Sequence, residues 1–259
     1  MDHKFLKIAK QAALEAGKII KKYSGKVHQK NIKFGDASDF ATEADLEAES
    51  VIIAILSKNF PDHNIVTEEQ ENIEKGSIYT WVVDPLDGTI TFEHNLPFFS
   101  VSIGLLKNNQ PYLGVVYKVA TDDFFWAIRN NGAYLNGKRI KVSKSKSLEE
   151  AAVIVDLGHK QKRPPKLDLY IKPMIFNAGY IYSFGSAVLT LGLVATGTVE
   201  AGISQAWIWD FAAASVILSE AGGRITDFEG NEPDWTKERM NIVASNGLVH
   251  DQILEALRQ

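Results

Sequence analysis

Two segments near the start of the chain repeat apolar residues at helical spacing. In residues 3–24 these positions share one face, with lysines on the other: Phe5, Ile8, Ala9, Ala12, Ala16, Ile19, Ile20 and Tyr23. A second helix is expected over residues 43–59, and Pro61 ends it. The polar, glycine-containing segment between the two, Ser24 to Asp39, predicts a mobile loop or a loose hairpin.

Shorter apolar runs follow and are separated by residues typical of turns. The predicted strands are 63–67, 79–83, 98–106, 111–119 and 123–129. The last three are expected to form an antiparallel meander. Its turns are Lys107-Asn108-Asn109-Gln110 and Asn130-Asn131-Gly132, and Asn136-Gly137 closes another hairpin. The first half of the chain is therefore expected to place two helices against an antiparallel sheet.

From Ser143 to Glu150 the chain becomes polar and charged, which suggests a boundary between subdomains. Beyond it, strands are expected near 151–156, 179–184, 198–203, 224–227 and 241–245. They alternate with helices near 166–177, 186–196, 209–221 and 248–257. This alternation is typical of an α/β unit. We expect an α+β / α/β protein of two packed subdomains, residues 1–143 and 144–259.

Composition and charge exclude several classes of function. The formal net charge of -4 argues against a nucleic-acid-binding surface, and the absence of cysteine excludes thiolate chemistry. The N-terminus lacks the pattern of a signal peptide, and the most lipid-like stretch, Tyr180 to Gly197, is interrupted by Ser, Thr and Gly. We expect a cytoplasmic protein that binds neither nucleic acid nor membrane.

The apolar run Trp81 to Val83 ends abruptly in the segment Asp84-Pro85-Leu86-Asp87-Gly88-Thr89. Pro85 lacks a backbone donor, so the strand is expected to stop there, and Gly88 permits a tight turn. Hard cations prefer carboxylate and carbonyl oxygens, and free amides at a helix start favour phosphate. The segment therefore predicts a metal ion held against a phosphate. The structural alternative is an Asx-type turn whose aspartates cap the backbone.

Three further acidic clusters lie beside apolar elements, and each has a structural alternative. Asp45 follows Thr42 by three residues, as in a capping box. Glu68, next to Glu69, follows a strand and also fits a solvated loop. Asp210 opens a helix whose positive end it would complement, but its neighbours are apolar, so its carboxylate needs a partner.

Convergence of these clusters would have a defined chemistry. Each close pair of carboxylates repels by ~4 kcal/mol near a protein surface, so divalent cations would be needed. Two such ions, ~3.5–4 Å apart, would clamp the attacking and leaving oxygens of a phosphoryl displacement. The chain contains no G-x-S-x-G elbow, phosphate-binding P-loop or zinc-spaced histidines. The D-x-D-G-T design, which forms an aspartyl-phosphate, is disfavoured because Asp87 is three positions from Asp84.

These motifs resemble the inositol monophosphatase family. The resemblance is carried by Asp84-Pro85-Leu86-Asp87-Gly88-Thr89, Trp209-Asp210 and Glu220-Ala221-Gly222-Gly223, and it runs from Thr42 through Asn246. The family belongs to a lithium-sensitive group of magnesium phosphatases that includes fructose-1,6-bisphosphatases and nucleotide 3′-phosphatases. The resemblance implies a layered α-β-α-β-α sandwich of the sugar phosphatase type, assembled as a homodimer.

The resemblance also implies residue roles. Two or three Mg²⁺ ions would be ligated by Glu68, Asp84, Asp87, Asp210 and the backbone carbonyl of Leu86. The catalytic residues would be Asp45 and Thr89, which orient and deprotonate the attacking water, together with Glu68. The substrate-binding residues would be Gly88, Thr89, Gly185, Ser186, Ala187 and Asp210.

Two positions depart from the family pattern. Thr91 stands where the family often has Asn, and Gly202-Ile203-Ser204-Gln205 lacks the carboxylate that bonds a ring hydroxyl in inositol-specific members. Loss of such a contact relaxes discrimination. The basic segment Lys160 to Arg163 fits a solvated loop or a contact to a second phosphate.

The expected function is Mg²⁺-dependent hydrolysis of small polyol or sugar phosphates by metal-activated water attack, with the small phosphorylated substrate as partner. Fructose-1,6-bisphosphatase and 3′-phosphoadenosine 5′-phosphate phosphatase activities are alternatives within enzymes. A regulatory binding protein that keeps the fold is the alternative outside enzymes.

Overall fold

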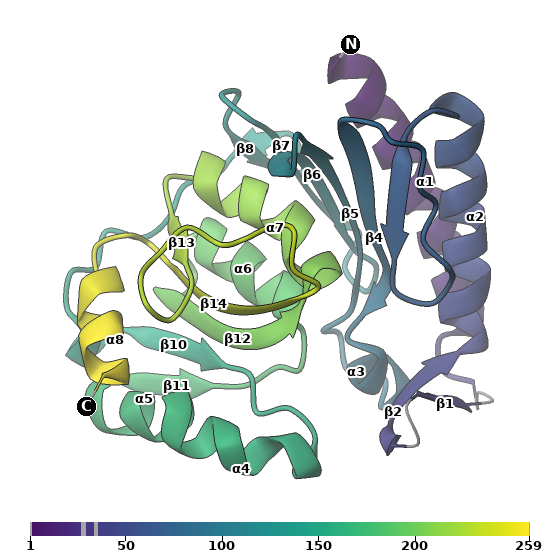
Figure 1. Cartoon of the computed structure of the whole chain (residues 1–259). Coiled ribbons are helices and arrows are strands. Elements are labelled where there is room, and N and C mark those ends of the chain that lie inside the picture. Colours follow the sequence, from purple (N-terminus) through teal and green to yellow (C-terminus); the bar gives the residue numbers. More distant parts are fainter. Residues whose placement is uncertain (1, 27–29, 34–35, 259) are drawn as a thin grey trace.

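The computed structural model describes residues 2–26, 30–33 and 36–258, which fold into alternating layers of helices and sheets (Figure 1). Helices α1 (Asp2–Tyr23) and α2 (Glu43–Asn59) form the outer layer on one side. Helices α6 (Ala187–Ala195) and α7 (Ile208–Glu220) lie between the two large sheets. Helices α5 (Lys172–Asn177) and α8 (His250–Leu257) form the other outer layer. The predicted α-β-α-β-α sandwich is confirmed.

The first large sheet is the predicted meander with one parallel strand added at its edge. Its order is β3-β4-β5-β6-β7-β8-β9, and only β3 and β4 are parallel among its described pairs. Asn108 and Asn109 have φ of 51° and 56°, which the tight β5–β6 turn requires. The strands are β3 (Asn64–Thr67), β4 (Tyr79–Asp87), β5 (Ser100–Lys107), β6 (Gln110–Lys118), β7 (Asp123–Ile128), β8 (Ala133–Leu135) and β9 (Lys138–Arg139).

The second large sheet is mixed and follows the order β11-β10-β12-β14-β13. Strand β10 runs parallel to β11 and β12, whereas β14 runs antiparallel to β12 and β13. The strands are β10 (Ala152–Val155), β11 (Tyr180–Tyr182), β12 (Ala201–Trp207), β13 (Arg224–Thr226) and β14 (Arg239–Ser245). The predicted boundary at residue 143 falls between the two sheets, and the division into two subdomains stays a prediction.

Shorter elements complete the chain. Strands β1 (Lys30–Lys33) and β2 (Asp36–Thr42) pair in an antiparallel ribbon. For Ser24 to Asp39 the sequence predicted a mobile loop or a loose hairpin, and the ribbon agrees with the hairpin. Residues 27–29 and 34–35 of this segment lie outside the described residues. The helix expected at 166–177 is present within a continuous helical run from Arg163, which widens into a π-helical turn before Pro173, a residue that cannot donate to that turn. The remaining elements are α3 (Thr89–Glu93), 3₁₀ turns Leu148–Glu150 and Lys160–Lys162, α4 (Arg163–Lys166) and a π-helical turn Leu167–Ile171.

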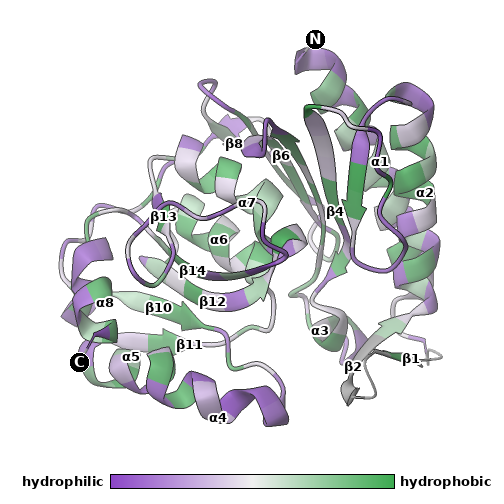
Figure 2. Ribbon diagram, viewed as in Figure 1, coloured by the Kyte–Doolittle hydropathy of each residue, from purple (hydrophilic) through white to green (hydrophobic). Residues whose placement is uncertain are grey.

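Apolar side chains fill each interface between layers. One cluster joins α1 and α2 to the first sheet, a second fills the space around α6 and α7, and a third lies under α5 and α8. Figure 2 shows hydrophobic and hydrophilic residues alternating along α1 and α2, as expected for helices with one face on a sheet. Among the described helices, none has the length and apolarity needed to cross a bilayer.

Strand β4 differs from its prediction at the position that matters most. It continues through Pro85 to Asp87, so the expectation that the strand stops at Pro85 is wrong. The register against β5 shifts here: Asp84 pairs with Ser102 and Asp87 with Ser100, so β4 carries one extra residue. This bulge accommodates a residue without a backbone donor and turns the strand end toward the middle layer.

Candidate active site

Three carboxylates from two layers meet at the end of β4. Ligand oxygens of Asp84, Asp87 and Asp210 all lie within 4.8 Å of one another. Asp84 and Asp87 stand on either side of the β4 bulge, and Asp210 lies in the first turn of α7. The structure therefore brings together acidic residues that the sequence places far apart. The expectation that they converge agrees with this geometry.

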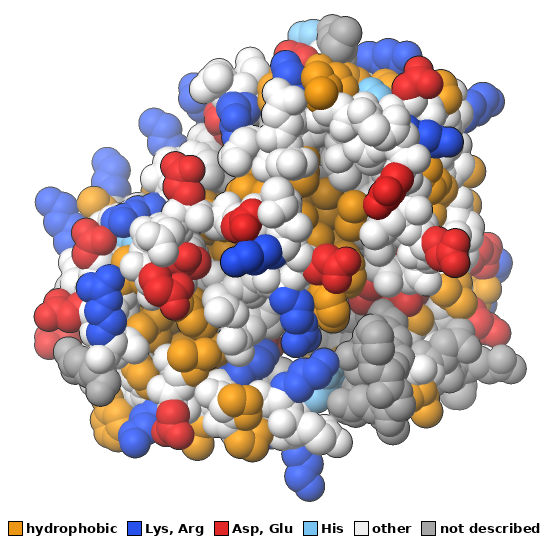
Figure 3. All heavy atoms as spheres, viewed as in Figure 1, with side chains coloured by type: hydrophobic (Ala, Val, Ile, Leu, Met, Phe, Trp, Pro, Cys, Tyr) orange, Lys and Arg blue, Asp and Glu red, His pale blue; other side chains and the backbone are white. Residues whose placement is uncertain are grey.

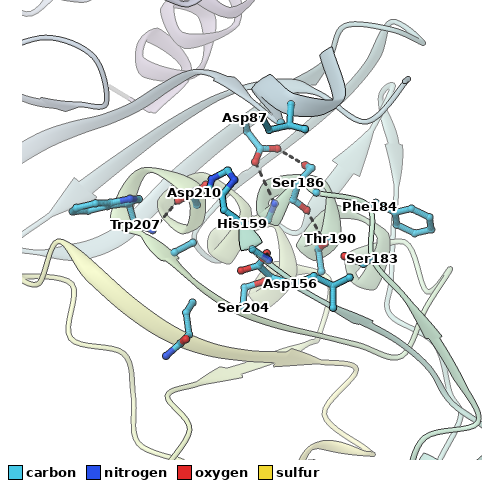
Figure 4. A pocket seen from close by; sticks show the side chains of 18 of the residues that line it. Asp87, Asp156, His159, Ser183, Phe184, Ser186, Thr190, Ser204, Trp207 and Asp210 are labelled. Atoms are coloured by element: carbon cyan, nitrogen blue, oxygen red, sulfur yellow. Dashed lines mark hydrogen bonds between the residues drawn. The ribbon is translucent and has the colours of Figure 1, made fainter. Parts of the chain in front are cut away.

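The backbone holds two of these carboxylates in place. Asp84 Oδ1 accepts a hydrogen bond of 2.9 Å from the amide of Leu86. Asp210 Oδ2 accepts one of 2.7 Å from the amide of Trp207, so it also caps α7 as its structural alternative required (Figure 4). Capping occupies one oxygen of Asp210 and leaves the other available to the cluster.

Asp87 is held by the start of α6. The hydroxyl of Ser186 and the amide of Ala187, the latter at 3.2 Å, both donate to its carboxylate, as does Ser100 at 3.3 Å (Figure 4). Ser186 also caps α6 by accepting from Leu189. The stretch predicted to bind substrate therefore also positions a predicted metal ligand.

The cluster is electrostatically strained without a cation. Burial, followed by the neighbouring carboxylate charges, raises the pKa of Asp84 and Asp210 well above the ordinary range. Burial raises the pKa of Asp87 to about 7, although the hydrogen bond from Ser186 opposes the shift. Carboxylate oxygens are the donors that hard divalent cations prefer, so this site fits such a cation.

Glu68 follows β3 and lines the same cavity as Asp87 and Asp210. Its charge contributes to the raised pKa of all three aspartates. Glu49, fully buried on α2, accepts hydrogen bonds from the amide of Glu69, at 2.9 Å, and from the hydroxyl of Thr67. Sequence reasoning missed Glu49, although an acid among the apolar positions of α2 was a signal.

Asp45 caps α2, as its structural alternative required, and it also contacts Thr89, with which it is predicted to act. Its Oδ2 accepts from the amide of Thr42 at 2.8 Å, which caps α2. Its Oδ1 lies 3.2 Å from the hydroxyl of Thr89, which is also 3.1 Å from the carbonyl of Leu86. The predicted catalytic pair Asp45–Thr89 is thus in contact, beside the predicted carbonyl ligand.

Gly88 shapes the turn between β4 and α3. Its φ is 85°, and a Cβ at this position would lie 2.4 Å from the carbonyl oxygen of Phe98. Thr91, which departs from the family pattern, donates its hydroxyl to the carbonyl of Gly88 at 2.7 Å. The turn therefore requires glycine, and the amides of Gly88 and Thr89 are fixed in the first turn of α3.

These groups surround a cavity of about 310 Å³ between the sheets. Its lining includes Glu68, Asp87, Asp210, the Gly88–Thr89 turn and the stretch Gly185, Ser186 and Ala187. Other lining residues were not proposed for the site from the sequence, because their types and spacing gave no signal: Asp156, His159, Lys166, Trp207 and Arg239. Lys162 and Ser204 also line the cavity and lay in segments that the sequence had singled out, Lys160 to Arg163 for a phosphate contact and Gly202 to Gln205 for a missing carboxylate.

Comparison with known proteins agrees with this geometry. The model of the inositol monophosphatase family matches residues 1–259. A fructose-1,6-bisphosphatase/inositol-1-monophosphatase of Aquifex aeolicus is 37% identical over 258 residues, covering 99% of this chain and 96% of the relative. Inositol monophosphatase 2 of Solanum lycopersicum is 36% identical and covers 98% of each chain. The crystal structure of the extragenic suppressor protein suhB of Bartonella henselae superposes with a TM-score of 0.91 at 32% identity, covering 99% of both chains.

Proposed function

This chain belongs to the inositol monophosphatase family, and we propose that it hydrolyses small polyol or sugar phosphates in a Mg²⁺-dependent reaction. Membership makes it a phosphatase, that is, a phosphoric monoester hydrolase. The observation that carries the proposal is the convergence of Asp84, Asp87 and Asp210 beside the Asp45–Thr89 pair. A regulatory protein that had lost turnover would not need both features intact.

The proposed ligands of two or three Mg²⁺ ions are those of the sequence resemblance: Glu68, Asp84, Asp87, Asp210 and the carbonyl of Leu86. The raised pKa values of the three buried aspartates support a cation here, since an opposite charge would favour their ionised forms. Bound Mg²⁺ would supply Lewis acidity at the phosphoryl group and lower the pKa of water.

The side chains and backbone amides of the site would have separate roles in the reaction. Asp45 and Thr89 would orient the attacking water, and Asp45 would take its proton. The amides of Gly88 and Thr89 would donate to phosphate oxygens as negative charge develops. Ser186 and Ala187 would keep Asp87 in position, and Gly185 would border the leaving alcohol.

The other enzyme designs are not favoured. Asp84 is 1% exposed and accepts from the Leu86 amide, so it is poorly placed to become an aspartyl-phosphate. The reported relatives are named for inositol monophosphatase, in one case together with fructose-1,6-bisphosphatase, and neither name includes a nucleotide phosphatase. A separate 3′-phosphoadenosine 5′-phosphate phosphatase therefore has no specific support.

We also propose the homodimer that the resemblance implies. Large apolar side chains on α5 and the edge strand β11 are exposed, namely Ile175, Phe176 and Tyr180, with Phe176 77% exposed. Light scattering during size exclusion should give twice the chain mass, and Phe176→Glu should weaken the dimer if this face forms it. A cytoplasmic location stays a prediction.

The test of the proposed activity is phosphate release from a small panel, in Mg²⁺ and in excess chelator. The panel holds inositol 1-phosphate, glycerol 2-phosphate, fructose 1,6-bisphosphate and adenosine 3′,5′-bisphosphate. Magnesium-dependent release from the first three would support the proposal. Release from none, with magnesium binding intact, would overturn it.

A further inference from the structure

We propose that Glu49 on α2 is a positioning residue for the reaction, which fixes the segment that carries the proposed metal ligand Glu68. This inference rests on the proposed function and adds a residue to the same site. Its core is that Glu49 accepts hydrogen bonds from the residues on both sides of Glu68, namely Thr67 and Glu69. Glu49 does not line the cavity itself, so it would act through Glu68, which does.

Glu49 is buried where an apolar side chain would be expected. Its exposed fraction is 0%, and its buried neighbours on α2 belong to the core that joins this helix to the first sheet, among them Ala48, Ile52 and Leu56. Figure 3 shows where acids ordinarily lie, with Asp and Glu side chains spread over the surface among basic and neutral ones. A buried carboxyl costs free energy unless hydrogen bonds compensate it, so its contacts indicate its role.

The two hydrogen bonds of Glu49 enclose Glu68. The Oε1 atom of Glu49 accepts from the amide of Glu69 at 2.9 Å and from the hydroxyl of Thr67, the last residue of β3. A residue whose two neighbours in the chain are both held has little freedom to turn its side chain away. Because one oxygen receives both donors, loss of the Glu49 carboxyl would release both sides of Glu68 together and leave two donors without their acceptor.

The register of β3 against β4 brings Glu68 to the acidic cluster. The two strands run parallel, and Thr67 pairs with Val83. The next residues along the two strands, Glu68 and Asp84, are therefore neighbours. Their proximity agrees with the contribution of the Glu68 charge to the raised pKa of Asp84. Strand pairing thus brings Glu68 beside the cluster, and the two hydrogen bonds to Glu49 fix its backbone there.

The same helix supports the proposed water-activating pair. Asp45, four residues before Glu49 on α2, is also 0% exposed and lies 3.2 Å from the hydroxyl of Thr89. Residues four apart in a helix lie on one face, with Cβ atoms about 5–6 Å apart. Helix α2 therefore presents two buried acids one turn apart, one in contact with Thr89 and the other behind Glu68. The helix would fix the spacing between the proposed general base and a proposed metal ligand.

The test replaces Glu49 by residues of similar size that keep or remove the acceptor. Glu49→Gln keeps a carbonyl oxygen for both donors, whereas Glu49→Met keeps only the volume. In chelator, hydrogen exchange at the Glu69 amide should be at least about tenfold faster in Glu49→Met, because that amide loses its acceptor. Calorimetric titration with Mg²⁺ should give a dissociation constant about tenfold higher in Glu49→Met, the usual effect of losing a group that orients a metal ligand. Glu49→Gln should stay close to the parent chain in both measurements.

Controls separate a positioning role from a loss of stability. Leu56→Ala removes buried packing further along α2, so it should lower the unfolding temperature and leave the Mg²⁺ dissociation constant unaltered. Ser50→Ala removes an exposed contact to Gln70 in the same segment and should leave both quantities unaltered. Thr67→Val keeps Glu49 and loses only the hydroxyl that donates to it, and it should raise the constant several-fold.

The outcomes distinguish this inference from the proposed function. A parental Mg²⁺ dissociation constant in Glu49→Met would overturn the role of Glu49 alone, and so would a Glu49→Gln variant as impaired as Glu49→Met. If Glu49→Met does not fold, an unaltered constant in Thr67→Val would have the same meaning. No magnesium-dependent phosphate release from the parent chain would overturn the proposed function instead. Exchange at the Glu69 amide in chelator would still show whether Glu49 holds the segment.

Discussion

The carboxylate of Asp45 and the hydroxyl of Thr89 lie 3.2 Å apart, although 44 positions separate them in the chain. The hydroxyl has one proton and two acceptors within reach, Asp45 and the carbonyl of Leu86 at 3.1 Å. If another partner occupies that carbonyl, the hydroxyl donates to Asp45, and its lone pairs are left to accept from water. Donation to Asp45 would aim the lone pairs of the hydroxyl at a water whose proton could pass through Thr89 to Asp45, as the proposed reaction requires.

Asp45→Asn is expected to lower kcat by roughly 10²–10⁴-fold, the usual contribution of a general base. The amide oxygen can still accept from Thr42, so α2 should keep its cap and the protein its fold. Phosphate release and thermal unfolding should be measured together. Asp62→Asn, an exposed acid beyond α2, is the matched control and should leave both unchanged. Asp45→Asn with undiminished kcat would exclude Asp45 as the base.

Asp84→Asn should abolish magnesium-dependent turnover while leaving the fold intact. The change removes a ligand oxygen and little volume, and it relieves the repulsion that raises the pKa of the buried aspartates. In chelator the variant should therefore unfold at a temperature equal to or higher than the parent chain. Calorimetry and phosphate release test the two statements separately. Retained turnover would count heavily against the metal-assisted mechanism.

The fold and much of the proposed site were open to sequence reasoning because periodicity and local turn chemistry encode them. Helices α1 and α2, the hairpin turn at Asn136-Gly137 and the acids at element ends all carried local signals. The strand end at Pro85 was predicted wrongly, because a bulge let β4 continue past a residue that cannot donate. Local propensity does not report such cross-strand adjustments.

Several other residues that line the cavity lay beyond sequence reasoning for a different reason. Arg239, Lys166 and Asp156 stand alone among ordinary neighbours, and only the sheet in which β10 and β14 flank β12 brings them to one cavity. Long-range convergence of single residues has no periodicity to reveal it. The acidic cluster was accessible because each of its members marked the end of an apolar element.

Stability without metal should fall as pH rises. The folded-state pKa of Asp87 is about 7, against an ordinary value of 3.8, so the folded chain binds more protons than the unfolded chain between these values. This contribution to the free energy of unfolding, on the order of 4 kcal/mol, is fully present below about pH 4 and is lost by about pH 7. Thermal unfolding in chelator across this range measures it.

Magnesium should reverse this trend at high pH. At pH 8 added Mg²⁺ should raise the unfolding temperature strongly, and at pH 5 much less, because protons compete for the same carboxylates. A chain whose stability in chelator rises from pH 4 to pH 7 and gains nothing from Mg²⁺ would contradict the metal site. The Asp84→Asn variant provides the control, since its dependence on both pH and Mg²⁺ should be reduced.

Ser186→Ala should weaken metal activation more than folding. The Ser186 hydroxyl donates to Asp87 and opposes the rise in its pKa, so its loss should favour the protonated carboxyl. The Mg²⁺ concentration for half-maximal activity should rise several-fold. The pH profile of activity should also shift to higher pH, because a higher pKa keeps the Asp87 carboxyl protonated over a wider range. Ser215→Ala is a buried control on α7, where the hydroxyl donates to the carbonyl of Ala212 within the same helix. Equal effects in both variants would assign Ser186 a purely structural role.

Gly88→Ala tests whether the turn itself is part of the site. Gly88 and Gly137 have similar positive φ, 85° and 78°, so alanine costs about 1–2 kcal/mol of backbone strain at either position. Only at Gly88 would the new Cβ meet backbone, 2.4 Å from the carbonyl of Phe98, whereas nothing lies within 4 Å at Gly137. Relief of that contact must move the Gly88–Thr89 amides. We expect Gly137→Ala to lose stability alone and Gly88→Ala to lose nearly all phosphate release as well. Equal activity in the two variants, measured at a temperature where both are folded, would show that the amides are not required.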